Sequence, residues 1–308
     1  MQATTSPSGS APRPLAPAVR GNRAYRMAAL LNRGLLYVTA ITLSLMFMFP
    51  FFWTVSTSLK TPVELIRVPP TILPAVPRWE NYTQIWGLGS GINFGRFFYN
   101  SAVITGLSLV GQIISAFLVG YGFARFRFPG RNVLFAVCLS TLILPPHVTI
   151  IPLFVLFSSL RWIDTFLPLI VPSFFGGGAF TIFLIRQFIL TLPIELDEAA
   201  LMDGASRLGI LFRIILPNSG PVLATVAIFG FISHWNQFLE PLIFLNSARK
   251  YTVSLGLWFL RATEGQAGLP KDNLLMAGAV MATLPIIIVF FLAQKYFVRG
   301  IAMSGLKG

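Results

Sequence analysis

The chain has 308 residues, of which 55% are hydrophobic and 11% are charged, whereas about a quarter of the residues in soluble domains are charged. This balance excludes an ordinary soluble protein and indicates a membrane protein. The formal net charge of +13 does not indicate nucleic-acid binding, because the basic residues flank apolar runs instead of interleaving with aromatic residues.

The amino-terminal 33 residues are rich in Ser, Pro, Ala and Arg and show no periodicity, so we expect 1–33 to form a disordered cytoplasmic tail. The next apolar stretch is longer than a signal-peptide core and lacks a clear small-x-small cleavage site, which favours an uncleaved signal anchor. We expect residues 34–96 to hold this first transmembrane helix and an external segment. Residues 97–308 would then form the transmembrane core.

Apolar runs long enough to cross about 30 Å of hydrocarbon predict an all-α integral membrane protein with six transmembrane helices. The runs lie near 34–59, 98–124, 132–157, 165–185, 221–245 and 274–294. Pro145, Pro146 and Pro152 break the helix of the third run. The external segment at 60–97 carries five prolines and Trp79, Tyr82 and Trp86, and we expect it along the membrane interface. The triplet Gly176–Gly178 in the fourth run predicts either a bend or close helix packing, and we favour packing.

Basic residues fix the expected orientation, because cytoplasmic loops carry an excess of Lys and Arg. They precede the first run (Arg13, Arg20, Arg23, Arg26, Arg33), follow the second (Arg125, Arg127, Arg131) and follow the last (Lys295, Arg299, Lys307). We therefore expect a multi-pass protein of the cell membrane with both termini in the cytoplasm. The same orientation puts the loop at 193–217 on the cytoplasmic side.

This loop predicts a helix-turn-helix that another protein could contact. Pro193 suits the first turn of a helix, and Glu195, Asp197 and Glu198 would lie at the positive end of its dipole. Gly204 suits a left-handed residue at the end of that helix. Ser206 would then cap an amphipathic segment that runs through Leu208, Leu211 and Ile215 to Pro217. The small side chains of Ala199 and Ala200 would allow close approach of a partner beside the Glu198 carboxylate.

The string Glu198-Ala199-Ala200, Gly204, Ile214, Leu216 and Pro217 closely resembles the cytoplasmic signature loop of ABC-transporter permease subunits. The resemblance covers about residues 97–308 and is strongest to the carbohydrate-importer branch, in particular to the maltose-type second permease. It rests further on Asn100-Ser101, Tyr121–Phe126, Phe183–Phe188, Trp235–Phe238, Tyr296–Gly300 and Lys307-Gly308. Gln237 departs from the branch, where an acidic residue is expected after Trp-Asn.

The resemblance implies a type I ABC importer permease fold with a cytoplasmic coupling helix. It implies a heterodimer with a second permease subunit, two ATPase subunits that use ATP, an extracytoplasmic solute-binding protein and a sugar-like solute. In maltose-type systems the other permease holds most of the solute. The expected ATPase-docking residues are Glu198, Ala199, Ala200, Asp203 and Gly204.

Polar residues inside the apolar runs are the candidates for a solute path, because burying them in lipid is costly. Asn100 and Gln112 have the alternative role of joining helices. For the group His234, Asn236, Gln237 and Glu240 we expect a pathway or a permease interface. His147 and His234 stand without a metal-ligand cluster, so no cofactor or metal is expected on this chain.

Two other classes of protein remain to be weighed against an ABC permease. A secondary active transporter needs an intramembrane carboxylate for ion coupling, and only Glu240 is available. An intramembrane enzyme needs a nucleophile and base or a metal cluster, and neither pattern occurs. The chain also has no G-x-x-x-x-G-K-[ST] string with which to hydrolyse ATP.

Overall fold

The computed structural model describes residues 22–87, 93–264 and 271–304, and every regular element in these ranges is a helix. The chain divides into two compact units, Met1–Phe52 and Trp53–Gly308. The predicted borders at 33 and 96 do not coincide with this division and remain predictions.

The first unit contains most of α1 (Asn22–Ser58). The helix begins inside the segment predicted to be disordered, so residues 22–33 are helical; the prediction for 1–21 lies outside the described residues. The span Ala29–Ser58 has a mean hydropathy of 2.0, and none of its most apolar part is buried. A helix that is apolar on all sides requires lipid or other helices around it.

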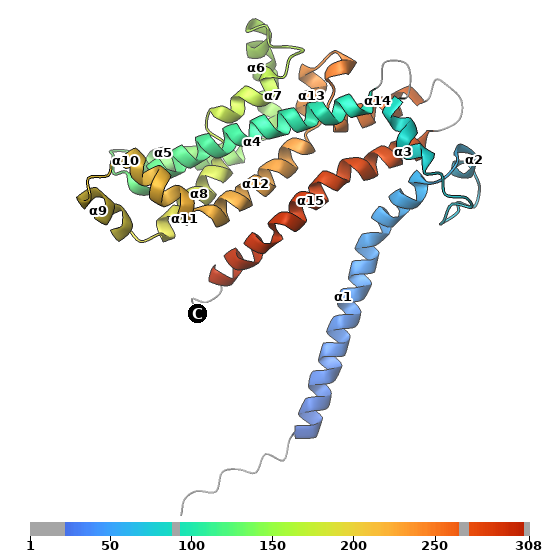
Figure 1. The fold of residues 1–308 in the computed structure, drawn as a ribbon, viewed down its shortest axis with the longest axis horizontal. Coiled ribbons are helices and arrows are strands. Elements are labelled where there is room, and N and C mark those ends of the chain that lie inside the picture. Colours follow the sequence, from blue (N-terminus) through green and yellow to red (C-terminus); the bar gives the residue numbers. More distant parts are fainter. Residues whose placement is uncertain (1–21, 88–92, 265–270, 305–308) are drawn as a thin grey trace, which may run out of the picture. The chain divides into compact units, whose positions relative to one another are not determined.

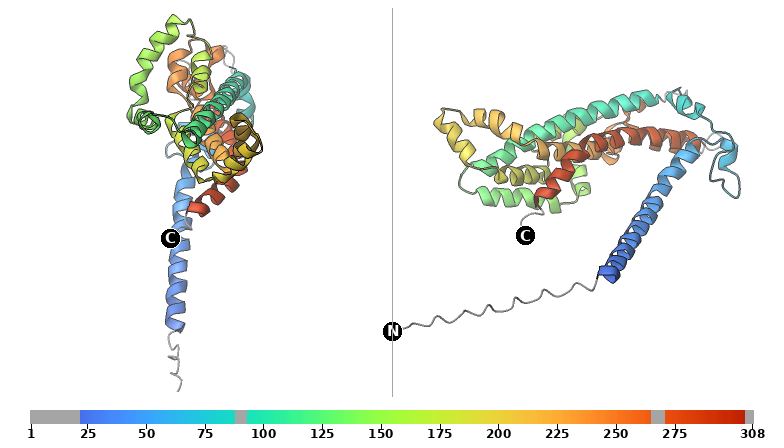
Figure 2. Two further views of the ribbon diagram at one scale, coloured as in Figure 1. Left: turned by 90° about the vertical axis from the view of Figure 1, so that its left-hand side faces the viewer. Right: turned by 60° about the horizontal axis from the view of Figure 1, so that its bottom comes forward.

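The second unit is a bundle around α4 (Phe94–Arg125), which packs along α8 (Ala179–Thr191) and α12 (Gly220–Trp235). The helix α15 (Asp272–Ser304) packs along α12 (Figure 1). The views in Figure 2 show the same neighbours from two further sides. The remaining elements are α2 (Pro62–Leu65), α3 (Glu80–Gln84), η1 (Ile85–Gly87), α5 (Arg131–Ser140), η2 (Thr141–Ile143), α6 (Pro146–Ser159), α7 (Leu167–Ile170), η3 (Val171–Phe174), α9 (Glu195–Met202), α10 (Arg207–Ile210), η4 (Leu211–Ile215), α11 (Leu216–Asn218), α13 (Leu239–Phe244), η5 (Ala248–Lys250) and α14 (Val253–Glu264).

The described residues contain four helical segments long and apolar enough to cross a membrane, and two bent pairs, which makes up to six spans if each pair counts as one. The third predicted run is one of the bent pairs: its halves meet at 100° around Pro145 and Pro146, as the prolines predicted. The fifth predicted run does not continue to 245, because its helix ends at Trp235 and α13 begins separately at Leu239. Here Pro241, which has no N–H to donate, lies in the first turn of the new helix.

The glycine triplet serves both roles considered for it. Gly176, Gly177 and Gly178 all have positive φ, at 114°, 60° and 84°, and they separate η3 from α8. A Cβ on Gly177 would lie 2.5 Å from Gln112 O and 2.6 Å from Ala116 Cβ. Only glycine therefore permits both the turn and the close approach to α4.

The end of the bundle remote from α9 is held by a carboxylate in the turn between α6 and α7. Asp164 Oδ1 accepts hydrogen bonds from the N–H groups of Asn246 and Ser247, both at 3.0 Å. Its Oδ2 accepts from Ser247 Oγ at 2.6 Å and from Lys250 Nζ at 2.9 Å. Burial opposes ionisation of this carboxyl, but the hydrogen bonds from Ser247, Lys250 and Asn246 outweigh it and hold the pKa of Asp164 well below its ordinary value. The contact is therefore made by the charged form and persists until the pH falls through that lowered pKa.

We expect Asp164→Gly to release the turn at 246–247 while keeping the backbone relaxed, since Asp164 has φ of 59°. Hydrogen exchange of the Asn246 and Ser247 amides should become about tenfold faster or more, because hydrogen bonds to a charged acceptor are lost. Asp164→Asn, which also tolerates positive φ, should fall between Gly and the parent. Unchanged exchange in the glycine variant would contradict this role.

Candidate functional site

The predicted helix-turn-helix is present at 195–218, and its corner is a Schellman turn at the end of α9. Gly204 N donates to Leu201 O at 3.0 Å, and Ala205 N donates to Ala200 O at 2.9 Å. Gly204 has φ of 80°, and a Cβ there would have no heavy atom within 4 Å. Backbone conformation, not space, therefore requires glycine at this position.

The second arm of the corner starts where the sequence predicted. Ser206 is in extended conformation, and its Oγ accepts a hydrogen bond from Gly209 N at 3.1 Å. The arm continues through the π-helix η4, and π-helical turns often occur at functional sites. It meets α12 at an angle of 77°. Ser219 lies at this bend and is fully buried, and its Oγ donates a hydrogen bond to Ile215 O at 2.7 Å.

Arg125, the last residue of α4, anchors the loop. Its Nε lies 3.2 Å from Asp197 Oδ2, and the two side chains are only 4% and 1% exposed. Its Nη2 donates to Leu192 O at 2.9 Å. Tyr121, one turn earlier on α4, donates to Arg207 O at 3.3 Å. Both arms of the corner are thus fixed to one helix.

The buried ion pair is a constraint on position more than a source of stability. Burial raises the pKa of the Asp197 carboxyl, against the opposing charges of Arg125 and Arg207. Taking both charges out of water costs about as much as their attraction returns. Removing one partner, in contrast, leaves the other unpaired in the interior.

The loop also packs through an apolar cluster. Ala200, one of the expected docking residues, is 8% exposed and packs inward with Ile210, Leu211 and Ile215, so it lies on the side of α9 that faces its own chain. The reason is helical periodicity: Asp197 and Ala200 are three residues apart and share the buried face of α9. In the amphipathic segment after Ser206, Leu211 and Ile215 are buried, whereas Leu208 is 63% exposed. Pro193 lies two residues before α9, not in its first turn.

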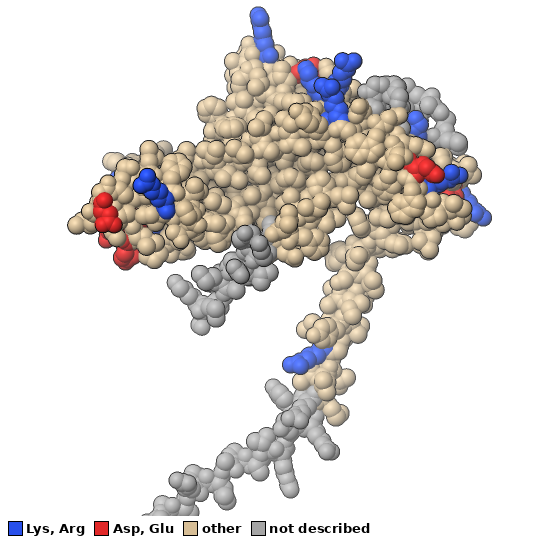
Figure 3. Space-filling view, viewed as in Figure 1, with Lys and Arg blue, Asp and Glu red and all other residues tan. Residues whose placement is uncertain are grey.

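The outward face of α9 carries the rest of the predicted docking set. Glu198, Ala199, Asp203 and Gly204 are exposed. Met202 is 88% exposed and lies four residues after Glu198, on the same side of the helix. On the face shown in Figure 3, acidic side chains gather at this end, and an uncharged band separates them from the charged side chains near α6 and α13. The exposed face, which we call the α9 face, consists of Glu198, Ala199, Met202 and Asp203.

The predicted group of His234, Asn236, Gln237 and Glu240 does not form one cluster, and its members make separate contacts. His234 Nε2 lies 3.0 Å from the acceptor Gln112 Oε1, and Gln112 Nε2 donates to Thr181 Oγ1 at 2.9 Å. Gln237 donates to Glu240 beyond the end of α12. Asn236 is exposed, and its side chain donates to Ile232 O at 2.9 Å. The polar contact among α4, α8 and α12 is thus centred on Gln112 and His234.

Asn100 has the structural role that was the alternative for it. It is 2% exposed and donates to Arg249 O at 2.9 Å and to Tyr251 O at 3.0 Å. The contact holds α4 against the turn that follows α13. Among the described residues, no group of three or more His, Cys, Asp or Glu side chains could hold a metal ion.

Sequence reasoning missed three residues of the site. Arg125 was interpreted only as a charge that orients the membrane helices, and Asp197 only as a charge at a helix end. The sequence did contain a signal for this pair. Arg125 ends one predicted span and Asp197 follows another, so the two charges can pair only if the ends of these spans meet in the fold. Met202 had no signal beyond its apolar side chain in a polar loop.

Comparisons with known proteins agree on one kind of protein. The family described as "Binding-protein-dependent transport system inner membrane component" matches residues 112–303. The chain is 37% identical over 268 residues to the arabinooligosaccharides transport system permease protein AraQ of Bacillus subtilis (strain 168), covering 86% of this chain and 92% of that one. It is 34% identical over 264 residues to the sn-glycerol-3-phosphate transport system permease protein UgpE of Yersinia enterocolitica, covering 84% and 92%. Its fold is similar to a chain of a bacterial ABC transporter involved in the import of the acidic polysaccharide alginate, with a TM-score of 0.74 and 24% identity over 90% of this chain and 98% of that one.

Variants of the buried pair of Arg125 and Asp197 should lose stability in a definite order. We expect Asp197→Leu to cost about 3–5 kcal/mol in folding free energy, because it leaves the buried charge of Arg125 without its partner. Arg125→Met should cost less, since the stranded carboxyl of Asp197 can bind a proton. A raised folded-state pKa stabilises the protonated form, so the defect of Arg125→Met should shrink as the pH falls from 7.5 to about 5.5.

The double variant Arg125→Met/Asp197→Leu should recover most of the loss. The measurement is the folded fraction in detergent by size-exclusion chromatography across temperature. Additive losses in the double variant would show that the two residues do not act as a pair.

Proposed function

Because the chain belongs to the family of binding-protein-dependent transport system inner membrane components, and is thus a permease of an ABC importer for sugars or related solutes, we propose that the α9 face is its docking site for an ATPase subunit. The partner ATPases supply the energy by using ATP, and this chain forms half of the translocation path. The relatives named for arabinooligosaccharides and sn-glycerol-3-phosphate support a hydroxyl-rich solute.

The observation that carries the proposal is the combination of a fixed corner with an exposed end. The loop is tied to α4 on both sides of α9: Arg125 contacts Leu192 O and the Asp197 side chain, and Tyr121 contacts Arg207 O. Glu198, Ala199 and Met202 meanwhile face outward. The small Ala199 allows close approach to a partner. The Glu198 carboxylate suits a basic or polar group there, and the long Met202 side chain suits insertion into a cleft. A structural loop needs the anchors but has no reason to expose Met202.

The orientation in the membrane belongs to the same proposal. The α9 loop shares its end of the bundle with Arg127 and Arg131, which follow Arg125 in the chain, and such basic residues favour the cytoplasmic side. Both termini are then cytoplasmic in a six-span protein, and the end of the bundle near Asp164 lies on the extracytoplasmic side. There a solute-binding protein delivers the solute to this chain and a second permease subunit.

We assign the pair of His234 and Gln112, rather than the whole group at 234–240, to the polar part of the path. These side chains come from two helices and meet inside the bundle. Gln237 and Glu240 lie after the helix end and suit an interface with the second permease. Asn236, exposed at the end of α12, belongs to that same interface.

Coupling variants test the docking face. We expect Glu198→Lys and Gly204→Val to leave membrane insertion intact but to lower ATP-dependent uptake into proteoliposomes by about tenfold or more, since a β-branched residue at positive φ is strained by roughly 1–3 kcal/mol. The purified assembly should also lose stimulation of ATP hydrolysis by loaded binding protein.

Two matched variants separate contact from general effects. Gly204→Asn tolerates positive φ and should retain most of the coupling. Glu195→Lys makes the same charge change one turn earlier on α9 and should have a smaller effect than Glu198→Lys. Uptake that persists without ATP in all variants would instead indicate a secondary active transporter.

Labelling of single cysteines tests the orientation. In a background with Cys138 replaced, we expect cysteines at positions 10, 202 and 306 to react only with membrane-permeant maleimide in intact cells. Cysteines at 75 and 265 should react with an impermeant reagent, because they lie outside. An outside position for 306 would overturn the six-span arrangement.

A further inference from the structure

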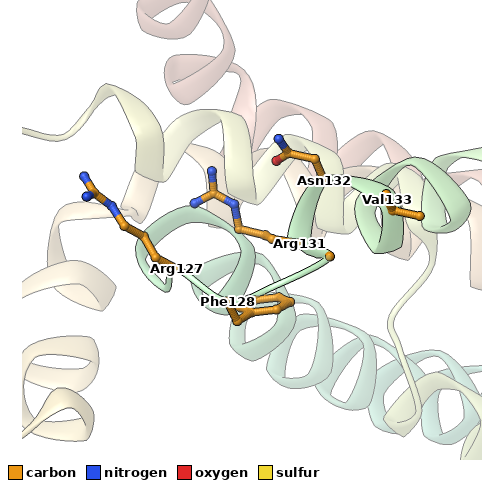
Figure 4. A pocket seen from close by; sticks show the side chains of 6 residues that line it. Arg127, Phe128, Arg131, Asn132 and Val133 are labelled. Atoms are coloured by element: carbon orange, nitrogen blue, oxygen red, sulfur yellow. The ribbon is translucent and has the colours of Figure 1, made fainter.

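The turn between α4 and α5 forms an open pocket that the coupling role does not use. The pocket has a volume of about 370 Å³ and is lined by Arg127, Phe128, Gly130, Arg131, Asn132 and Val133. In Figure 4 the side chains of Arg127 and Arg131 project to the same side of the turn, with Asn132 beyond them. Gly130 makes this arrangement possible, because its φ of 78° turns the chain sharply into α5.

The charge of this pocket is uncompensated. The ion pair at this end of the bundle joins Arg125 to Asp197, and none of the ion pairs among the described residues involves Arg127 or Arg131. Arg186 of α8 does not line the pocket but lies close to it, with its Cζ 4.2 Å from the ring centroid of Phe135. Since Phe135 follows Arg131 by one helical turn, Arg186 lies against the first turns of α5. Its Nε is buried without a hydrogen-bond partner among the described residues.

Exposed apolar side chains surround these arginines. Phe126 and Phe128 are each 39% exposed, Val133 is 67% exposed and Leu134 is 53% exposed. The turn also joins two helices that have the composition of membrane spans. Guanidinium groups beside exposed apolar residues at the end of membrane helices suit an amphiphile with an anionic head and acyl chains. A soluble phosphate would leave the apolar residues uncovered.

We propose that this pocket binds the phosphate of an anionic phospholipid. Arg127 and Arg131 donate hydrogen bonds to the phosphate oxygens, the Asn132 amide reaches the rest of the headgroup, and the acyl chains lie along Phe128, Val133 and Leu134. Paired N–H donors make arginine well suited to phosphate. The site requires that the chain lie in a membrane, but it is independent of the docking of α9 and of the solute.

The test measures lipid retention by the purified transporter complex. The complex is reconstituted with equal amounts of phosphatidylglycerol and phosphatidylethanolamine, then extracted mildly, and the bound lipids are counted by native mass spectrometry. We expect tightly held phosphatidylglycerol in the parent. Retention should fall about fivefold in Arg127→Gln or Arg131→Gln and about 25-fold in the double variant, as expected for the attraction of each basic residue to an anionic headgroup.

The control is Arg213→Gln, which removes an exposed arginine outside the pocket and should leave retention unchanged. Equal retention in the parent and the double variant overturns the proposal, and so does an equal loss in the Arg213 control. A further arm adds inorganic phosphate during extraction. If millimolar phosphate displaces the lipid, the pocket is a site for soluble phosphate, and the lipid assignment is wrong. The assay contains neither ATP nor solute, so a failure of the proposed coupling leaves its result unaffected.

Discussion

The contact between Arg125 and Asp197 determines where the loop that contains α9 lies. One planar guanidinium meets a carboxylate of α9 on one side and the Leu192 carbonyl on the other, so it fixes the distance between the end of α8 and the first turn of α9. A lysine could neutralise Asp197 but could not address both partners in fixed directions. The pair gains little stability because both charges are desolvated. Its value is that the exposed face of α9 has a single orientation relative to α4.

The features of the loop that depend on local conformation were predictable from the sequence. Gly204 ends α9 in the left-handed region and Ser206 caps the next segment because these preferences involve only neighbouring residues. The direction in which each side chain faces was less predictable, since it depends on what α9 packs against. Ala200 and Asp197 turn inward because α4 and α10 supply a core and a cation on that side. The sequence motif alone therefore does not show which of its residues face outward and which hold the loop in place.

The membrane spans show a similar division. Hydropathy indicated where apolar helices lie, and the prolines indicated the bend around Pro145. Hydropathy did not show that α12 ends at Trp235, because apolar residues resume in Leu239–Phe244 directly beyond the helix end. The helix end is visible only through polar contacts, in which Asn236 turns back to Ile232 O and Gln237 pairs with Glu240. For the candidate path, the sequence identified His234 but gave no reason to pair it with Gln112, which is 122 residues away in the chain.

The bend at Ser219 determines how a movement of the arm would reach α12. The arm from Arg207 to Asn218 meets α12 at 77°, and the fully buried Ser219 closes the joint with a side-chain bond to Ile215 O. If the arm moves and this bend keeps its angle, α12 turns with the arm, and the residues of α12 farthest from Ser219 move most. His234 lies near that far end of α12, so its contact with Gln112 is the part of the helix most sensitive to such a displacement.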